Sequence, residues 1–525
     1  MSFATWYYPF FLLLTALIFW LLPSRARTPF IVAASFVFYA FWDVRFIAML
    51  IAAAVFDWTC SNAIAGKKPS PLRVLGLALL PLAWLLAANL YQQVPVAAMV
   101  SAAVGVPLYL TLFAFSKTKK HFLVLAIAGS LTLLGFFKYA GWFADNLRLA
   151  LEAAGMQAGW STLNILLPIG ISFHIFQSIA YVADVYHRKL EPEPSFLRIL
   201  NMLCFFPQLV AGPIERAAHL LPQLRFGRAF DWRNLAWGCH LILVGYFLKV
   251  FLADSCGVVA DYYFNTLHAQ VASGAPAFGA GWTLAGLVAF ALQIYGDFAG
   301  YSLIARGSAL FFGVTLFRNF SLPYLALTPS DFWRRWHISL SSWFRDYVYI
   351  PLGGSRGGSG GSLARNVFLT MLLAGLWHGA SWRFVAWGAL HGGALIAWHA
   401  GGLPSTENLP GKSLVVKTSC WLLTMLVVLA GWAVFRAASL ADVQLMAQSL
   451  AHWASSGLPG ANGSWKWIAF HALPWLAILP VVGRGGEEPD LAGLPAWLLA
   501  PVYWVMFTLV ITAGNLRAEF IYFQF

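Results

Sequence analysis

The sequence predicts an all-α membrane protein that crosses the bilayer many times. Of its 525 residues, 60% are hydrophobic and only 10% are charged. Apolar runs of about 18 or more residues recur along the chain, and each is long enough to cross about 30 Å of hydrocarbon. Short clusters of basic residues separate these runs, as the positive-inside rule describes. We therefore predict a single membrane domain over residues 1–525, with N-terminal helices in 1–160, a core in 161–400 and C-terminal helices in 401–525.

Neither nucleic-acid binding nor a metal site is predicted. The net charge of +13 could suit a nucleic-acid binder, but the basic residues are spread as membrane-topology signals rather than gathered in a patch. The five cysteines lack metal-ligand or redox spacing, so we interpret them as packing residues. They are Cys60, Cys204, Cys239, Cys256 and Cys420.

The N-terminal part predicts a regular alternation of spans and cytoplasmic clusters. The first run, Trp6–Leu22, has no basic segment before it and no small-residue cleavage site after it, so we interpret it as a retained span. The basic clusters alternate with the spans in a consistent parity that places the N-terminus outside. The clusters are Arg25/Arg27, Lys67/Lys68, Lys117–Lys120 and Arg188/Lys189, and the apolar segments are Phe30–Phe41, Phe46–Ala65, Leu72–Leu90, Val96–Phe115, a run to about Phe143, and Ile165–Val185.

Polar residues within apolar runs are the first functional candidates, because such residues face a bundle interior or a wet cavity. His174 and Gln177 share one helix face, where they either line a site or are satisfied packing residues. The broken run Met202–Pro213 predicts a re-entrant or interfacial piece. Two further spans are expected at Leu235–Ala253 and Trp282–Gly300. Asp297 in the latter is either a functional acid or a paired or capping one.

The segment Thr328–Gly354 predicts an amphipathic helix that starts at Thr328 and Pro329. At about 100° per residue, one stripe carries the polar residues and the opposite stripe carries the aromatic and aliphatic ones. The polar stripe is Arg334, His337, Ser341 and Arg345, and the apolar stripe is Trp336, Leu340, Trp343 and Tyr347. Such a helix either lies on the membrane surface or folds inward and lines a polar site.

A second informative segment, residues 367–393, holds Trp377 and His378 after a long apolar run. A histidine at that depth needs hydrogen-bond partners or a water-filled cavity. The glycine-rich stretch before it, residues 353–362, is interpreted as a flexible linker in which Arg356 could meet an anion. The remaining expected spans are Leu414–Phe435, Trp467–Val482 and Trp497–Thr512, with an interfacial helix at Ser439–Trp453.

These residues suit acyl transfer. A neutral histidine can take the proton of a hydroxyl as it attacks a thioester, because its pKa is suited to general-base work near neutral pH. His378 fits that role, and His337 fits as a second polar group that orients or polarises. Arg334, Arg345 and Arg356 could hold the phosphates of an anionic donor.

Several blocks resemble the membrane-bound O-acyltransferase family, MBOAT, in its AlgI-like bacterial branch of polysaccharide O-acetyltransferases. They are LLPIGISFHIFQSIAYVADVY (166–186), FPQLVAGPIER (206–216), FLKVFLADSCGVVAD (247–261), QIYGDFAGYS (293–302), FWRRWHISLSSWFRDYVYIPLGG (332–354) and LWHGASWRFVAWGALHG (376–392). The last two are the most specific. The resemblance implies a ring of about 11–13 transmembrane helices, with re-entrant and horizontal amphipathic helices, around a central tunnel formed by residues 161–400.

The resemblance also implies roles. His378 takes the place of the family's catalytic histidine and His337 that of the second histidine. Both would be neighbours in the tunnel, with Arg334, Ser341, Arg345, Trp336, Trp377, Asp297, His174 and Gln177 as candidate tunnel-lining or donor-binding residues. No bound cofactor is expected, and acetyl-CoA is the implied donor. A periplasmic or membrane-tethered acetyltransferase and an export machinery are the implied partners, beside membrane lipids, at the bacterial inner membrane.

Three functions remain open. The first is transfer of an acetyl group across the inner membrane for O-acetylation of an exported, alginate-like polysaccharide. The second is transfer of another acyl group, such as D-alanine to a teichoic acid. The third is transport without acyl transfer, against which the absence of an internal repeat counts mildly.

Overall fold

The computed structural model describes residues 3, 5–156, 165–209, 212–274, 278–355, 360–409, 411–451, 461–482, 495–514 and 520, and every regular element in these ranges is a helix. This confirms the predicted all-α class. The chain divides into two compact units. The first contains 1–238 and 305–317, and the second contains 239–304 and 318–525. Each is described separately below.

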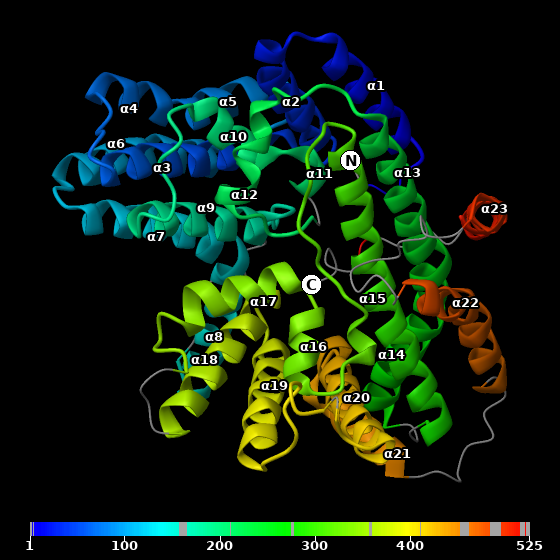
Figure 1. Ribbon diagram of the computed structural model, residues 1–525. Coiled ribbons are helices and arrows are strands. Elements are labelled where there is room, and N and C mark those ends of the chain that lie inside the picture. The colour runs from blue at the N-terminus through cyan, green and yellow to red at the C-terminus, as the bar shows by residue number, and fades with distance from the viewer. Residues whose placement is uncertain are drawn as a thin grey trace. The chain divides into compact units, whose positions relative to one another are not determined.

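The first unit is a bundle in which α3, α7 and α9 pack side by side (Figure 1). Its helices are α1 (Tyr8–Leu21), α2 (Ser24–Ala40), α3 (Ile47–Ile64), α4 (Pro71–Ala78), α5 (Leu80–Ala88), α6 (Val96–Phe115), α7 (Lys119–Leu134), α8 (Ala140–Ala153), α9 (Ile171–Tyr186), α10 (Phe196–Cys204), α11 (Phe206–Leu209) and α12 (Ala217–Leu220). The central helix α3 is almost entirely buried, whereas α6 keeps most of its apolar side chains exposed. An outward apolar face of this kind is what lipid tails can cover.

The second unit is also helical throughout its described residues. Its elements are α13 (Trp232–Tyr246, which begins in the first unit), the π-helix η4 (Phe247–Ala253), α14 (Asp254–Ser273), α15 (Ala280–Leu310, which ends in the first unit), α16 (Pro329–Arg335), α17 (Ile338–Phe344), the π-helix η6 (Arg345–Tyr349), α18 (Gly360–His378), α19 (Trp382–Ala400), α20 (Leu414–Arg436), α21 (Leu440–Ala451), α22 (Ala461–Val482) and α23 (Ala496–Ala513). Figure 1 shows α18 and α19 side by side as an antiparallel pair.

Seven helical segments among the described residues are long and apolar enough to cross a membrane. They are 44–64, 71–88, 98–115, 119–153, 232–273, 280–310 and 414–436, and Tyr8–Leu21 and Trp497–Ala513 are shorter apolar helices. The chain is therefore a multi-pass membrane protein by length and composition.

Several expected spans differ in detail. The expected span Leu235–Ala253 is part of one helical segment that runs from Trp232 to Ser273 through a π-helical stretch. The expected span Ile165–Val185 forms a helix only from Ile171, because Gly170 has a left-handed backbone, φ 75°. The segment Met202–Pro213 is broken into short pieces, in agreement with the prediction that it cannot form a full span.

Candidate active site

The predicted amphipathic helix over Thr328–Gly354 is wrong as one continuous helix. Its start is confirmed, because the Thr328 hydroxyl accepts the Asp331 amide at 3.0 Å and Pro329 is the first helical residue. The helix then ends at Arg335, and α17 begins at Ile338. Between them His337 has a left-handed backbone, φ 41°.

A neighbouring stretch of chain replaces the hydrogen bonds that this break removes. The Ser321 amide donates to the Arg335 carbonyl at 3.0 Å, and the Ile338 amide donates to the Asn319 carbonyl at 2.8 Å. A helix end buried without such partners would be costly. Residues 319–321 therefore make the break stable, which the periodicity of a single segment could not reveal.

The break removes the predicted polar stripe. Arg334 and Arg345 are exposed, and the Arg345 guanidinium bonds its neighbour Asp346 at 2.8 Å. The Ser341 hydroxyl donates to the Trp336 carbonyl at 3.1 Å. His337, by contrast, is completely buried. The four residues of the expected stripe therefore do not share one face.

Trp336 anchors the break within an aromatic cluster instead of lining an open face. Its indole is buried and stacks on Phe332, with ring centroids 5.6 Å apart. Trp432 lies 4.7 Å away and Phe320 lies 5.0 Å away. Because buried aromatic pairs add packing energy beyond the area they remove from water, this cluster fixes where the next residue, His337, must lie.

His337 contacts the polar side chain of Asn319 and the aromatic rings of Phe298 and Trp377. Its Nδ1 lies 3.3 Å from the Asn319 Oδ1. The Phe298 ring from α15 meets the imidazole edge to face at 4.6 Å, and the Trp377 ring from α18 lies 5.9 Å away. Burial lowers the pKa of the imidazole to about 3, so the ring is neutral at physiological pH.

His378 is the last residue of α18 and lies within an aromatic box. Its ring centroid is 4.9 Å from Trp387, 5.2 Å from Phe435 and 5.0 Å from Trp377. Because the Trp377 ring also contacts His337, one indole touches both histidines that the sequence singles out. The structure thus brings His337, Trp377 and His378 together, as expected.

Glycines allow α18 and α19 to pack closely enough to build that box. A Cβ at Gly375 would lie 2.2 Å from the Phe384 carbonyl oxygen, and one at Gly388 would lie 2.4 Å from the Met371 carbonyl oxygen. A Cβ at Gly379, which follows His378, would lie 2.2 Å from the Phe384 ring. Small residues spaced four apart permit this kind of close helix contact in membranes.

Asp297 on α15 belongs to a buried ion-pair network. The Lys249 ammonium lies 2.7 Å from a carboxylate oxygen of Asp297 and 2.7 Å from one of Asp254. All three side chains are at least 95% buried. Asp297 is therefore a paired acid, and its partner is Lys249. The next residue, Phe298, contacts His337 and so connects this network to the histidine.

His174 and Gln177 lie on α9 in the first unit, whereas His337 and His378 lie in the second. The Gln177 amide donates to the Gln208 side chain at 3.3 Å, and Gln208 donates to the Met202 carbonyl at 2.5 Å. His174 is buried beside Gly170. These contacts place both residues in the packing of α9 against the broken segment that follows α10.

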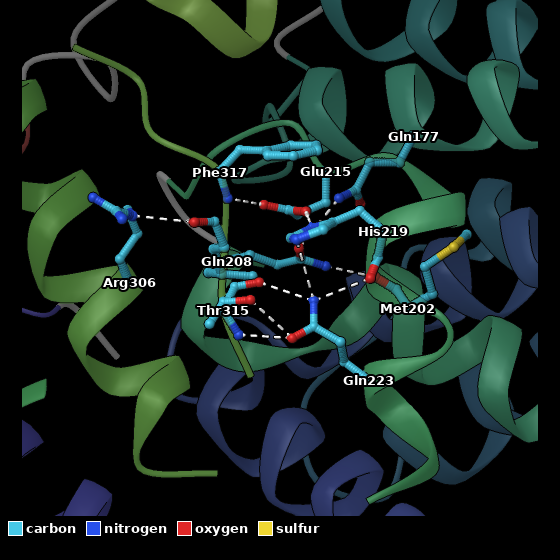
Figure 2. A network of polar contacts seen from close by, with 10 residues as sticks. Gln177, Met202, Gln208, Glu215, His219, Gln223, Arg306, Thr315 and Phe317 are labelled. Carbon is cyan, nitrogen blue, oxygen red and sulfur yellow. Dashed lines mark hydrogen bonds and ion pairs between the residues drawn. The ribbon is translucent and has the colours of Figure 1, made fainter. Parts of the chain in front are cut away.

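A second polar network of the first unit holds the chain that leaves α15 (Figure 2). The buried Glu215 carboxylate accepts the Phe317 amide at 2.5 Å and bonds the His219 ring at 2.8 Å. His219 stacks on Phe317 with centroids 4.3 Å apart. The Gln223 side chain accepts from the Thr315 amide at 2.9 Å. The network fixes residues 315–317, just before the stretch that contacts His337.

Sequence reasoning missed Asn319, Ser302, Ser339 and Lys249. Asn319 follows a short loop and carries no periodic signal, and Lys249 lies near the end of the expected span Leu235–Ala253. A lysine inside an apolar run, with acids five residues later and in a neighbouring span, was the available signal. Within the described ranges, no group of three His, Cys, Asp or Glu could hold a metal ion. Arg356 lies outside the described residues.

Comparison with known proteins identifies relatives of this chain. A sequence model of the membrane-bound O-acyltransferase family, MBOAT, matches residues 189–400, which include both histidines. The chain is 34% identical to the probable alginate O-acetylase AlgI of Azotobacter vinelandii, over 91% of this chain and 84% of that protein. It is 31% identical to the peptidoglycan O-acetyltransferase of Helicobacter pylori, over 80% of this chain and 74% of that protein.

A more distant relative is the teichoic acid D-alanyltransferase of Bacillus subtilis, 27% identical over 43% of this chain and 58% of that protein. The matched region includes both His337 and His378, and the identity extends over most of the chain. The chain belongs to the membrane-bound O-acyltransferase family, and it is an O-acyltransferase.

Proposed function

We propose that this enzyme moves an acetyl group from a cytoplasmic donor, acetyl-CoA, across the bacterial inner membrane for O-acetylation of an exported, alginate-like polysaccharide. The observation that carries the proposal is the single Trp377 ring that touches both His337 and His378. The relatives that match most of the chain are named for O-acetylation of alginate and of peptidoglycan, which supports acetyl as the group and an extracellular glycan as the acceptor.

In the proposed reaction His378 is the general base. Its imidazole takes the proton of the acceptor hydroxyl while the hydroxyl oxygen attacks the thioester carbonyl. The carbon–sulfur bond then breaks, the new ester leaves, and the imidazolium returns its proton to the thiolate. His337 orients or polarises the reacting groups. The aromatic rings around His378 keep water away, which limits wasteful hydrolysis of the thioester.

The exposed arginines Arg334 and Arg345 are proposed to contact the phosphates of the donor at the entrance to the site. If so, Arg334→Gln raises the KM for acetyl-CoA and leaves kcat unchanged, because the contact is equally strong in the ground and transition states. Kinetics on isolated membranes measure this, and an unchanged KM in both arginine variants contradicts the assignment.

The proposed partners are a periplasmic or membrane-tethered acetyltransferase and the machinery that exports the polymer. The proposed location is the inner membrane with the N-terminus in the periplasm. Single cysteines introduced at Arg25 and at Lys117, in a variant without native cysteines, should react only with a membrane-permeant maleimide. Labelling by an impermeant reagent in intact spheroplasts contradicts this topology.

The central test replaces His378 by glutamine and uses His391→Gln as a matched control. His391 is also buried and also contacts Trp387, but it lies on α19, thirteen residues further along the chain. We expect His378→Gln to abolish acetyl esters on the exported polymer, measured by NMR, while His391→Gln keeps them. Retained acetylation in a stably inserted His378→Gln protein contradicts the base assignment.

The alternative acyl group is D-alanine, which the similarity to a teichoic acid D-alanyltransferase favours. Isolated membranes supplied with radiolabelled acetyl-CoA, or with a D-alanyl-loaded carrier protein, separate the two. Transfer from only the loaded carrier supports the alternative.

A further inference from the structure

The side chains around His337 determine which of its two ring nitrogens carries the proton. A neutral imidazole has one N–H donor and one acceptor nitrogen, and the bond made by one nitrogen sets the role of the other. His337 Nδ1 lies 3.3 Å from Asn319 Oδ1, and the ring is neutral at physiological pH. The orientation of the Asn319 amide therefore decides the tautomer.

Two serines bond the Asn319 amide, one at each of its two ends. The Ser339 hydroxyl, on α17, donates to Asn319 Oδ1 at 2.6 Å. The Asn319 Nδ2 donates to the Ser302 hydroxyl, on α15, at 2.9 Å. All of these side chains are at least 96% buried, so water does not compete for the bonds. The 2.6 Å distance is typical of an O–H···O bond and the 2.9 Å distance of an N–H···O bond. The amide oxygen therefore points to His337, which makes Nδ1 the protonated nitrogen.

We propose that Asn319 is a positioning residue that holds His337 in the Nδ1–H tautomer, so that Nε2 is a hydrogen-bond acceptor toward the reacting groups. His337 then orients the bound substrate by accepting a hydrogen bond from a group other than the hydroxyl whose proton His378 takes. It does not polarise the thioester carbonyl, because that role requires a donor. The tautomer of His337 is inferred from the geometry alone. The role of Nε2 in the reaction rests on the proposed function.

Other ionisable groups near His337 are held in their own contacts. On α15, Asp297 precedes the Phe298 ring and pairs with Lys249 from η4. On α16, Arg335 pairs with Asp331 at 2.9 Å and Arg334 is exposed. On α18, His378 adjoins Trp377. A charge placed at position 319 is therefore a new charge beside the imidazole.

The test compares Asn319→Asp with Asn319→Leu. Both oxygens of an aspartate accept, so Asn319→Asp keeps the Nδ1–H tautomer, and its negative charge favours the imidazolium. We expect it to keep activity within about 10-fold at its own optimum and to move the acid limb of the pH profile upward. Asn319→Leu removes the acceptor and should lower kcat by about 10- to 100-fold, the range found when a group that orients a metal-binding histidine is lost.

If the Asn319 amide were reversed, Nε2 would carry the proton and Asn319→Asp would force the opposite tautomer. Asn319→Asp would then be as inactive as Asn319→Leu, without a shifted pH profile. That result overturns the proposal. If Asn319 had only a structural role, a folded Asn319→Asp protein would show the same pH profile of activity as the unmodified protein. That result also contradicts the proposal.

Nitrogen-15 NMR of labelled histidines gives a readout that does not depend on the acyl donor. The His337 signal is assigned among the 12 histidines by its loss in His337→Asn. We expect an Nδ1–H shift pattern in the unmodified protein and in Asn319→Asp, and an Nε2–H pattern or a mixture in Asn319→Leu. An Nε2–H pattern in the unmodified protein overturns the inference, even if the enzyme uses acetyl-CoA. If the protein shows the Nδ1–H pattern but does not transfer an acetyl group from acetyl-CoA, only the proposed function is overturned.

Discussion

Replacing Gly388 by alanine should damage the active site from a distance. The added Cβ would lie 2.4 Å from the Met371 carbonyl oxygen, whereas ordinary contacts of a Cβ begin at 3.4 Å, so α18 and α19 must separate by about 1 Å. Such overpacking costs about 1–3 kcal/mol of stability. Met371 lies on the helix that ends at His378, and a 1 Å misplacement of a catalytic group can lower the rate about 100-fold.

Gly393→Ala is the matched control, because Gly393 lies on the same helix with nothing within 4 Å of its added Cβ. Alanine there should stabilise the helix by about 0.4–1 kcal/mol and leave activity unchanged. The assay is acetyl transfer in membranes, normalised to the protein that elutes as folded in detergent, together with a melting curve. Equal activity and stability for Gly388→Ala and Gly393→Ala refute the close-packing argument.

Two further changes test the buried polar groups. Lys249→Met leaves the carboxylates of Asp254 and Asp297 uncompensated and should cost about 3–5 kcal/mol. The triple variant with Asp254→Asn and Asp297→Asn should recover most of that loss in a detergent melting curve, and no recovery contradicts the ion-pair account. Burial raises the pKa of Glu215, although bonds from His219 and the Phe317 amide oppose the shift. Because the folded protein holds the Glu215 proton more tightly than the unfolded chain, the protonated carboxyl contributes stability below about pH 4.3. That contribution is lost as the pH rises through the raised pKa. Glutamine cannot ionise, so the stability of Glu215→Gln should rise relative to that of the unmodified protein as the pH rises. A gain that shrinks with rising pH contradicts this sign.

Composition and charge placement predicted the fold class, because long apolar runs have few alternatives to membrane helices. Interruptions within elements were not predicted. The break at His337 depends on hydrogen bonds from residues 319–321, which lie sixteen or more residues earlier in the chain. Periodicity within one segment contains no information about such partners, so Arg334 and Arg345 were wrongly placed on the stripe of His337.

The proximity of His337 and His378 was predicted from family resemblance rather than from periodicity. The glycines that make it possible were visible in the sequence, since Gly375 and Gly379, and Gly388 and Gly392, are each spaced by four. That spacing is a signal of close helix packing in membranes, but it was not used to predict the α18–α19 pair. The role of Asn319 could not be predicted, because its partners lie on α15 and at the start of α17, seventeen or more residues away along the chain.

The left-handed backbone of His337 decides how this residue can be tested. A left-handed conformation costs an alanine about 1–2 kcal/mol, so an alanine variant would lose the ring and strain the chain at once. Glycine accepts the conformation freely. His337→Gly therefore keeps the chain path and leaves a ring-sized space beside Phe298, Trp377 and Asn319. Imidazole added to the medium could enter that space and restore transfer, which makes this position suitable for chemical complementation.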